Sequence, residues 1–152
     1  MQLDIGRTSM EQTSFYTYIK LAGNDDFPLD EVTARLQIEP TEAWRVGDKV
    51  RPNSPLERFY TCWLYKIGPV ESLDVDDVLV PLYERFHSKV DSVNALKEQY
   101  DLSVRIVVVI EIENGEKPAL TIAPTFSQFA SSMGAEIDID LYAYAYSEVS
   151  HD

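Results

Sequence analysis

The sequence contains very few of the residues that build catalytic and metal sites. Its 152 residues include one cysteine, Cys62, and two histidines, His87 and His151. A single cysteine cannot form an intrachain disulfide, and a reducing, cytoplasmic location is the natural expectation. One thiol and two isolated imidazoles cannot supply the ligands of a tetrahedral zinc site. No histidine lies near Cys62 in the sequence to activate its thiol, so we expect this side chain to be buried and structural.

Other absences exclude further kinds of site. The six glycines are scattered, and neither a Gly-x-Gly-x-x-Gly nor a Gly-Lys-Ser/Thr phosphate-binding motif occurs. No apolar run approaches the roughly 18 residues of a membrane span, and the longest, Ile106–Ile110, has the length of a strand. The acidic segment 71–77 lacks the glycine and the terminal glutamate of a calcium loop, so we expect its carboxylates to lie at a helix start. We therefore expect no catalytic residues, no metal and no cofactor.

Basic residues are also scarce. Lysine and arginine number 13 against 26 aspartates and glutamates, which gives a formal net charge of −13. Such an excess of acids argues against binding to nucleic acid or to anionic membranes. It favours electrostatic steering toward a basic partner protein. Solubility alone is an equally good explanation of the charge, and both interpretations stay open here.

What is present indicates one domain of mixed α and β structure. The strand patterns cover residues 15–21, 41–46, 58–67, 102–113 and 135–146, and the helical patterns cover 27–38, 74–100 with a break at 87–92, and 125–133. The order contains a βαββαβ portion, which predicts a ferredoxin-like sandwich with helices on one face of a mainly antiparallel sheet, extended by a C-terminal αβ unit. We expect an N-terminal tail over residues 1–14, a single domain over 15–147 and a C-terminal tail over 148–152.

Local signals also predict where these elements end. Gly68-Pro69 should stop the strand before it, and the unbroken Val/Ile run within 102–113 indicates a strand with both faces covered. Gly134 should end the last helix in the left-handed conformation. The predicted helix caps are Asp26, Asp76 or Asp77, Asp91 or Ser92, and Thr125.

The closing strand alternates regularly between two kinds of side chain. Its aliphatic side is expected to face the core and comprises Ile137, Ile139, Leu141, Ala143 and Ala145. Its other side carries acids and then tyrosines: Glu136, Asp138, Asp140, Tyr142, Tyr144 and Tyr146. We interpret Glu136, Asp138, Asp140, Tyr142 and Tyr144 as a candidate surface for binding a protein partner, because tyrosines are common interface anchors and a basic partner would relieve the repulsion between the acids.

Two alternatives to this interpretation stay open. The tyrosines could pack under the helices or a neighbouring loop as ordinary core, with the acids simply solvated. Carboxylates at successive steps on one strand face lie about 7 Å apart, a spacing compatible with acid and base catalysis of glycoside hydrolysis. Because nothing else in the sequence supplies a cleft, we expect an exposed acidic face and no active site.

A second candidate surface is the local cluster of bases around the segment 44–58. Its residues are Trp44, Arg45, Asp48 and Arg51, with Lys49 and Arg58 nearby. The alternative is that these bases pair with the protein's own acids and that Trp44 belongs to the core.

Two segments carry a resemblance to a known family. Residues 39–48, with their Pro-Thr, Trp and Gly-Asp, follow a strand and a helix, and residues 126–142 combine a helix, a glycine turn and an Asp-Ile-Asp-Leu-Tyr strand. In this order they resemble the domain-of-unknown-function 4279 family, over roughly residues 14–146. The resemblance implies a small bacterial cytosolic protein, and small domains of this kind are associated with immunity in polymorphic toxin systems. It carries over no catalytic residues.

The functional hypothesis that follows is a non-enzymatic, acidic binding protein. In its concrete form it is a bacterial immunity protein that neutralises a basic toxin domain by covering the toxin's active site. The alternative is a module that senses a small molecule, since sheets of this class often place ligands between helix and sheet. The oligomeric state is open in both.

Overall fold

The computed structural model describes residues 12–145. Of the predicted N-terminal tail over 1–14, residues 1–11 lie outside the described residues, as do the predicted tail over 148–152 and the orientation of Tyr146, whereas Ser14 already belongs to the first strand. The predicted order of strands and helices is confirmed. Along the chain the elements are β1 (Ser14–Gly23), α1 (Leu29–Leu36), β2 (Glu42–Trp44), β3 (Thr61–Glu71), α2 (Asp76–Phe86), a 3-10 turn η1 (His87–Lys89), α3 (Val90–Tyr100), β4 (Ser103–Ile112), α4 (Pro124–Ser132) and β5 (Glu136–Ala143).

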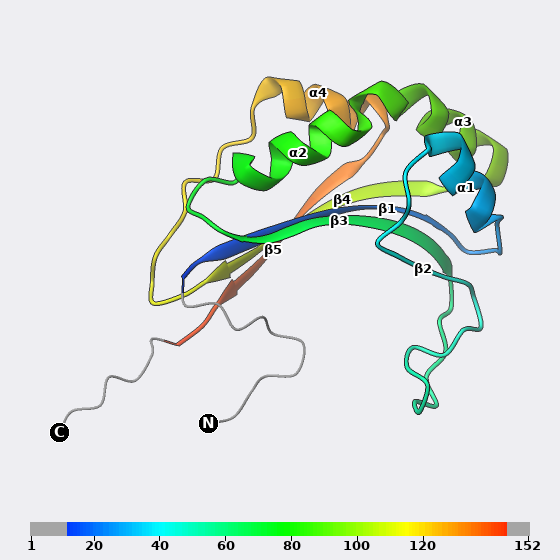
Figure 1. The fold of residues 1–152 in the computed structure, drawn as a ribbon, viewed down its shortest axis with the longest axis horizontal. Helices are drawn as coiled ribbons and strands as arrows, with labels where there is room; N and C mark the ends of the chain where they lie inside the picture. The colour runs from blue at the N-terminus through cyan, green and yellow to red at the C-terminus, as the bar shows by residue number, and fades with distance from the viewer. Residues whose placement is uncertain (1–11, 146–152) are drawn as a thin grey trace.

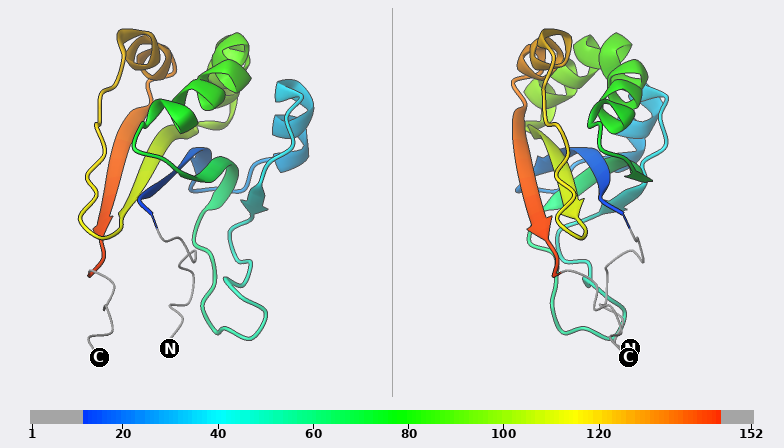
Figure 2. Two further views of the ribbon diagram at one scale, coloured as in Figure 1. Left: turned by 60° about the vertical axis from the view of Figure 1, so that its left-hand side comes forward. Right: turned by 90° about the vertical axis from the view of Figure 1, so that its left-hand side faces the viewer.

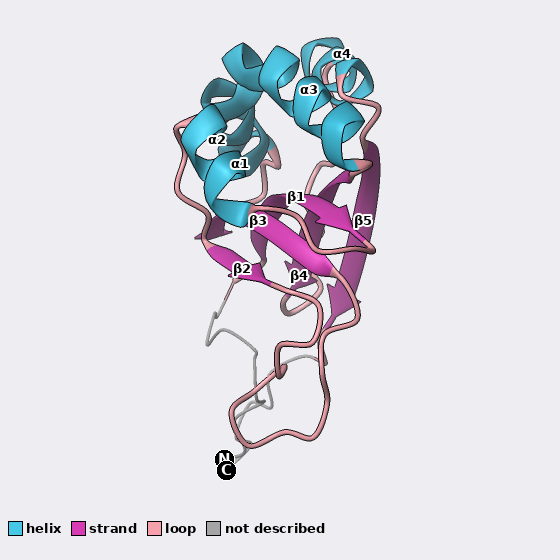
Figure 3. Cartoon of the chain, turned by 90° about the vertical axis from the view of Figure 1, so that its right-hand side faces the viewer, coloured by secondary structure: helices cyan, strands magenta, loops and turns pink. Residues whose placement is uncertain are grey.

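The strands form one sheet in the order β2-β3-β1-β4-β5. All neighbours are antiparallel except β4 and β5, which are parallel. The helices lie together on one face of the sheet (Figures 1 and 3). The prediction of an α+β protein with a mainly antiparallel sheet is therefore confirmed.

The hydrophobic core fills the space between the helices and this one face of the sheet. On β1 the alternate residues Phe15, Ile19 and Leu21 are fully buried in it. From β3 the indole of Trp63 enters the core and meets the ring of Phe86 on α2 edge to face, with centroids 6.2 Å apart. Burial of such aliphatic and aromatic side chains is the main favourable contribution to folding.

The predicted side-chain caps of the helices were wrong. The residues at the helix starts are Pro28, Val75, Lys89 and Ala123, and none of them forms a side-chain capping bond. Asp26 is engaged elsewhere, because its carboxylate accepts hydrogen bonds from Arg45 at 2.8 Å and from the hydroxyl of Thr61 at 3.3 Å. Thr125 lies inside α4, which begins with Pro124 at its first position, where the fixed φ of proline suits a helix start.

The predicted end of β3 at Gly68-Pro69 was also wrong. The strand continues to Glu71, and Val70 pairs with Phe15. Between the pairs Thr17–Ile67 and Phe15–Val70, two residues of β3 oppose one of β1, which is a β-bulge. The bulge absorbs the proline, which has no N–H for the ladder, and Gly68 adopts φ +94° there.

The aliphatic side of β5 is buried only at its beginning. Ile137 packs against the core, whereas Ile139 and Leu141 are 39% and 60% exposed. The reason is that β5 is an edge strand whose C-terminal half runs beyond the helices (Figure 2). The prediction that this whole side faces the core was therefore wrong for Ile139 and Leu141, and also for Ala143 and Ala145, which are exposed.

No helix within residues 12–145 is long and apolar enough to cross a membrane.

The contrast between buried and exposed isoleucines in the sheet gives a stability prediction. We expect Ile106→Ala to lower the free energy of unfolding by about 2–5 kcal/mol, because Ile106 is fully buried and its truncation leaves a cavity. Ile139→Ala, the same change on the neighbouring strand, should cost about 1 kcal/mol or less. Urea titrations followed by tryptophan fluorescence measure both, and equal losses would contradict the placement of β5.

Candidate functional site

The helices leave one face of the sheet uncovered, and we call it the open face. Since Phe15, Ile19 and Leu21 of β1 point into the core, the alternate residues Tyr16, Tyr18 and Lys20 point to the open face. The strand register then places Tyr16 and Tyr18 of β1 in a row with Val109 and Val107 of β4, and these in turn with the acids of β5. No described helix lies over this face (Figure 2).

The centre of the open face is aromatic and apolar. The rings of Tyr16 and Tyr18 stack with centroids 6.5 Å apart, and the ammonium of Lys66 lies 4.2 Å from the ring centroid of Tyr16. Beside them Val107 and Val109 are only 3% exposed. The prediction that both sides of β4 are buried is therefore confirmed. On the open face, Val107 and Val109 lie between tyrosines of β1 and aspartates of β5.

The acidic row of β5 is neutralised only in part by the protein itself. The guanidinium of Arg105 on β4 donates hydrogen bonds to Asp138 at 3.0 Å and to Glu136 at 3.4 Å. Asp140 is exposed, and no lysine or arginine of residues 12–145 forms an ion pair with it. The repulsion expected along the row is thus relieved at its start and persists at Asp140.

The tyrosines at the end of β5 lie on the same face. Tyr142 is 50% exposed, and Tyr144, just beyond the strand, donates its hydroxyl to the carboxylate of Glu111 at 3.0 Å. The alternative in which these rings pack under the helices is wrong, because the alternation that sends Ile137 to the core sends them to the opposite face.

Asp140 influences the ionisation of the central tyrosines. Burial, and then the negative charge of Asp140, raise the pKa of Tyr18 to about 12. The pKa of Tyr16 is also raised, first by burial and then by the charges of Glu111, Tyr142 and Asp140. Both phenols are therefore protonated at neutral pH, and a partner meets them as hydrogen-bond donors beside a carboxylate.

Sequence reasoning missed the central part of this site. Tyr16, Tyr18 and Lys66 were not among the predicted site residues, although Tyr16, Tyr18 and Lys20 alternate with apolar residues in β1 just as the acids and tyrosines do in β5. That alternation was the available signal. The alternation in β1 indicates a shared binding face only when β1, β4 and β5 are known to be neighbours in one sheet.

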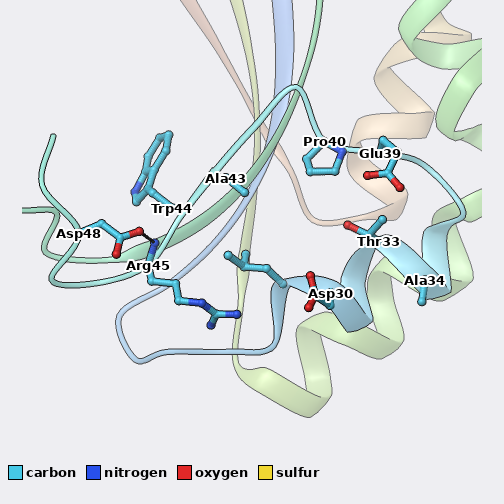
Figure 4. Close-up of a pocket in the computed structure, with 10 residues that line it drawn as sticks. Asp30, Thr33, Ala34, Glu39, Pro40, Ala43, Trp44, Arg45 and Asp48 are labelled. Atoms are coloured by element: carbon cyan, nitrogen blue, oxygen red, sulfur yellow. Dashed lines mark hydrogen bonds between the residues drawn. The ribbon is translucent and has the colours of Figure 1, made fainter. Parts of the chain in front are cut away.

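The second candidate surface does not form a single patch. Trp44 stands on the open-face side of β2 under the guanidinium of Arg58, 3.9 Å from its ring centroid. Arg45 turns the other way, toward α1 (Figure 4), and its guanidinium donates a hydrogen bond to Asp26 at 2.8 Å. Asp48 accepts the backbone N–H of Arg45.

Arg51 lies further along the loop between β2 and β3 and lines a different hollow from Arg45 and Asp48. Two of the nearby bases pair with the protein's own acids, Arg45 with Asp26 at 2.8 Å and Arg58 with Glu42 at 3.7 Å. Trp44 itself is half-buried and lies outside the core cluster. These contacts therefore favour the alternative in which the bases pair with the protein's own acids over a docking site.

A pocket of about 680 Å³ lies between α1 and β2 (Figure 4). The hydroxyl of Thr33, which lines the pocket, accepts a hydrogen bond from the indole N–H of Trp63 at 3.0 Å. The side chains that line it are of mixed character: Leu29, Asp30, Thr33, Ala34, Glu39, Pro40, Ala43, Trp44, Arg45 and Asp48.

The structure agrees with the expected role of the lone cysteine. Cys62 is fully buried in β3, and burial raises the pKa of its thiol to about 12, so the thiolate is scarce at neutral pH. Among residues 12–145 no group of three or more histidine, cysteine, aspartate or glutamate side chains is arranged to hold a metal ion.

A model of the family described as "Domain of unknown function (DUF4279)" matches residues 13–144. The chain belongs to this family. No curated protein and no solved structure matches it. The matched range contains both faces of the sheet, so the open face belongs to the DUF4279 domain itself.

The effect of Asp140 on Tyr18 in this DUF4279 domain can be measured. We expect Asp140→Asn to lower the pKa of Tyr18 from about 12, while burial keeps it above its ordinary value. Glu136→Gln is the control, because Glu136 is not among the groups that raise this pKa. NMR titration of ¹³C-labelled tyrosine, with Tyr18→Phe to assign the signal, gives the value.

An unchanged pKa in Asp140→Asn would show that the carboxylate does not face the ring. The raised value also has a consequence for stability. Because the folded state holds the Tyr18 proton more tightly than the unfolded chain, this group stabilises the fold below pH 10 and loses that contribution as the pH rises toward 12.

Proposed function

We propose that this protein is a non-enzymatic module that binds a basic partner protein through the open face. The observation that carries the proposal is Asp140, an exposed acid with which no lysine or arginine of residues 12–145 forms an ion pair. It lies beside Tyr18 and the half-exposed Tyr142 on a sheet face that no described helix covers. Lysine or arginine side chains of a partner would pair with Asp140, and the tyrosine rings would be buried against the partner's surface.

General properties of interfaces support this choice. Tyrosine buries a large area for little loss of conformational freedom and is enriched among the residues that dominate binding energy. The protonated phenols add hydrogen-bond donors. The net charge of −13 would speed the encounter with a basic protein over long range.

The partner class that we propose is a basic toxin domain, with this protein as a bacterial cytosolic immunity protein that covers the toxin's active site. The acidic charge and the association of small domains of this kind with toxin immunity support it. We also assign the fold to the ferredoxin-like sandwich with an added αβ unit, since β4, β1, β3 and β2 are successive antiparallel neighbours with helices on one side, and α4 and β5 follow as an extra unit.

Replacing Asp140 tests the surface. The chain would be co-expressed with the product of the adjacent gene and the complex measured by pull-down and calorimetry. We expect Asp140→Lys to weaken binding at least tenfold, because it places a cation where the partner's base docks. Glu98→Lys on α3 makes the same change of charge on the helix side, where Glu98 is exposed, and should leave affinity within about twofold.

Equal effects of the two variants would indicate that only overall charge matters and would contradict a site on the open face. A failure of the adjacent gene product to co-purify with the unmodified chain would remove the toxin-immunity form of the proposal.

The pocket between α1 and β2 supports a second candidate, a module that senses a small molecule. In a thermal-shift screen against metabolites, sensing predicts a rise in melting temperature with one ligand class. Ala34→Trp should abolish that rise by filling the pocket, whose lining includes Ala34. Asp140→Lys, far from the pocket, should retain it. A screen without any such rise would leave protein binding as the better account.

A further inference from the structure

Within residues 12–145, no strand pairs with the outer edge of β5. The strand ends the sheet order, and its only neighbour within the described residues is β4. In a parallel ladder every second residue directs its backbone N–H and C=O away from the paired side. Over the eight residues of Glu136–Ala143 this edge is about 26 Å long. Long open edges of this kind are templates for another strand unless something blocks them.

The two sides of this edge differ in chemistry. On the helix side, beyond the helices, Ile139 and Leu141 are 39% and 60% exposed. On the open face, the alternate positions are Asp138 and Asp140. Within residues 12–145, Asp138 forms an ion pair with Arg105 and Asp140 forms none. A strand laid along the edge would therefore meet aliphatic side chains on one side and carboxylates on the other.

This pattern disfavours a second copy of the same strand. In a continuous antiparallel sheet made by two copies of β5, residues on the same face oppose each other. With the two-fold axis at Ile139, Asp138 of each copy would lie opposite Asp140 of the other. Like charges directly across from each other destabilise a strand pair. A strand with bases at those positions has the complementary charge.

We propose that the outer edge of β5 accepts a strand of the partner in which lysine or arginine alternates with aliphatic residues. The bases lie on the open face beside Asp138 and Asp140, and the aliphatic side chains lie beside Ile139 and Leu141. Backbone hydrogen bonds to β5 hold the added strand, and the carboxylates and aliphatic side chains on the two sides of the edge select its alternating sequence. This inference rests on the proposed binding of a basic partner and specifies how that partner docks.

Synthetic peptides test the mode of binding with the whole chain. A nine-residue peptide that alternates lysine and valine should bind in fluorescence anisotropy at low salt at least tenfold more tightly than a peptide of the same composition in two blocks. A peptide that alternates glutamate and valine should not bind. In ¹⁵N NMR, the amide shifts caused by the first peptide should concentrate on residues 136–143.

Backbone methylation identifies the paired edge. Only every second N–H of the peptide can bond to β5, so N-methylation of one alternate set should abolish binding and methylation of the other set should change it little. Equal effects of the two sets would overturn strand addition.

A substitution on the helix side of the edge provides a second measure. Leu141→Glu should weaken binding of the alternating peptide at least tenfold, because it replaces an aliphatic contact by a charge. Leu56→Glu is the matched control, since Leu56 is 66% exposed in the loop between β2 and β3 and far from β5 in sequence. It should change affinity less than twofold.

The outcomes separate this inference from the function on which it rests. If Leu141→Glu and methylation have no effect while Asp140→Lys still abolishes binding, the partner docks over the open face, and strand addition is overturned alone. If Leu141→Glu, Asp140→Lys and methylation of the basic peptide all leave binding unchanged, both strand addition and binding through the open face are overturned. If sedimentation shows a dimer that Leu141→Glu dissociates, the edge serves a second copy, and the inference is overturned.

Discussion

The pairing of β1 on both of its edges is the constraint on which the rest of the structure depends. β4 pairs with Ser14–Ala22 in one register, and β3 pairs with the other edge with a single bulge, so the alternating residues of β1 must take opposite faces. Phe15, Ile19 and Leu21 then anchor the helices, while Tyr16 and Tyr18 remain on the uncovered side. The core and the candidate binding face are therefore two consequences of the same pairing.

The covered and uncovered faces have different energetic roles. The covered face supplies most of the stability through apolar burial, since Trp63, Phe86 and Ile106 are fully buried. Each described base on the open face lies beside an aromatic ring or an acid of that face. For example, Lys66 lies over the ring of Tyr16, and Arg105 pairs with Asp138. Exposed pairs of this kind contribute little to stability, so this face is free to serve recognition.

Much of the fold could be predicted from local pattern, and the failures share a physical cause. The order of elements, the buried Cys62 and the glycine at the end of α4 follow from periodicity and local backbone preference. The role of Asp26 could not be predicted in this way, because its carboxylate binds Arg45, a residue distant in sequence, and does not cap α1. Alternation in β5 showed that two faces exist, but the exposure of Leu141 depends on whether a helix extends over it. Likewise, Tyr16 and Tyr18 became part of a site only through neighbours distant in sequence.

The central position of β1 also shapes the way the chain reaches this structure. The hydroxyl of Thr17 bonds to the carbonyl of Val107, 90 positions later in the chain. Forming contacts between such distant residues first requires the loss of entropy that closes a long loop. A domain of this topology is therefore expected to fold slowly compared with a helical bundle. On the ribosome, β1 can pair with β3 first but lacks its second neighbour until β4 has been synthesised. The strand that organises the sheet therefore keeps one edge unsatisfied through most of synthesis, which makes this interval the one in which the nascent chain most needs protection from other chains.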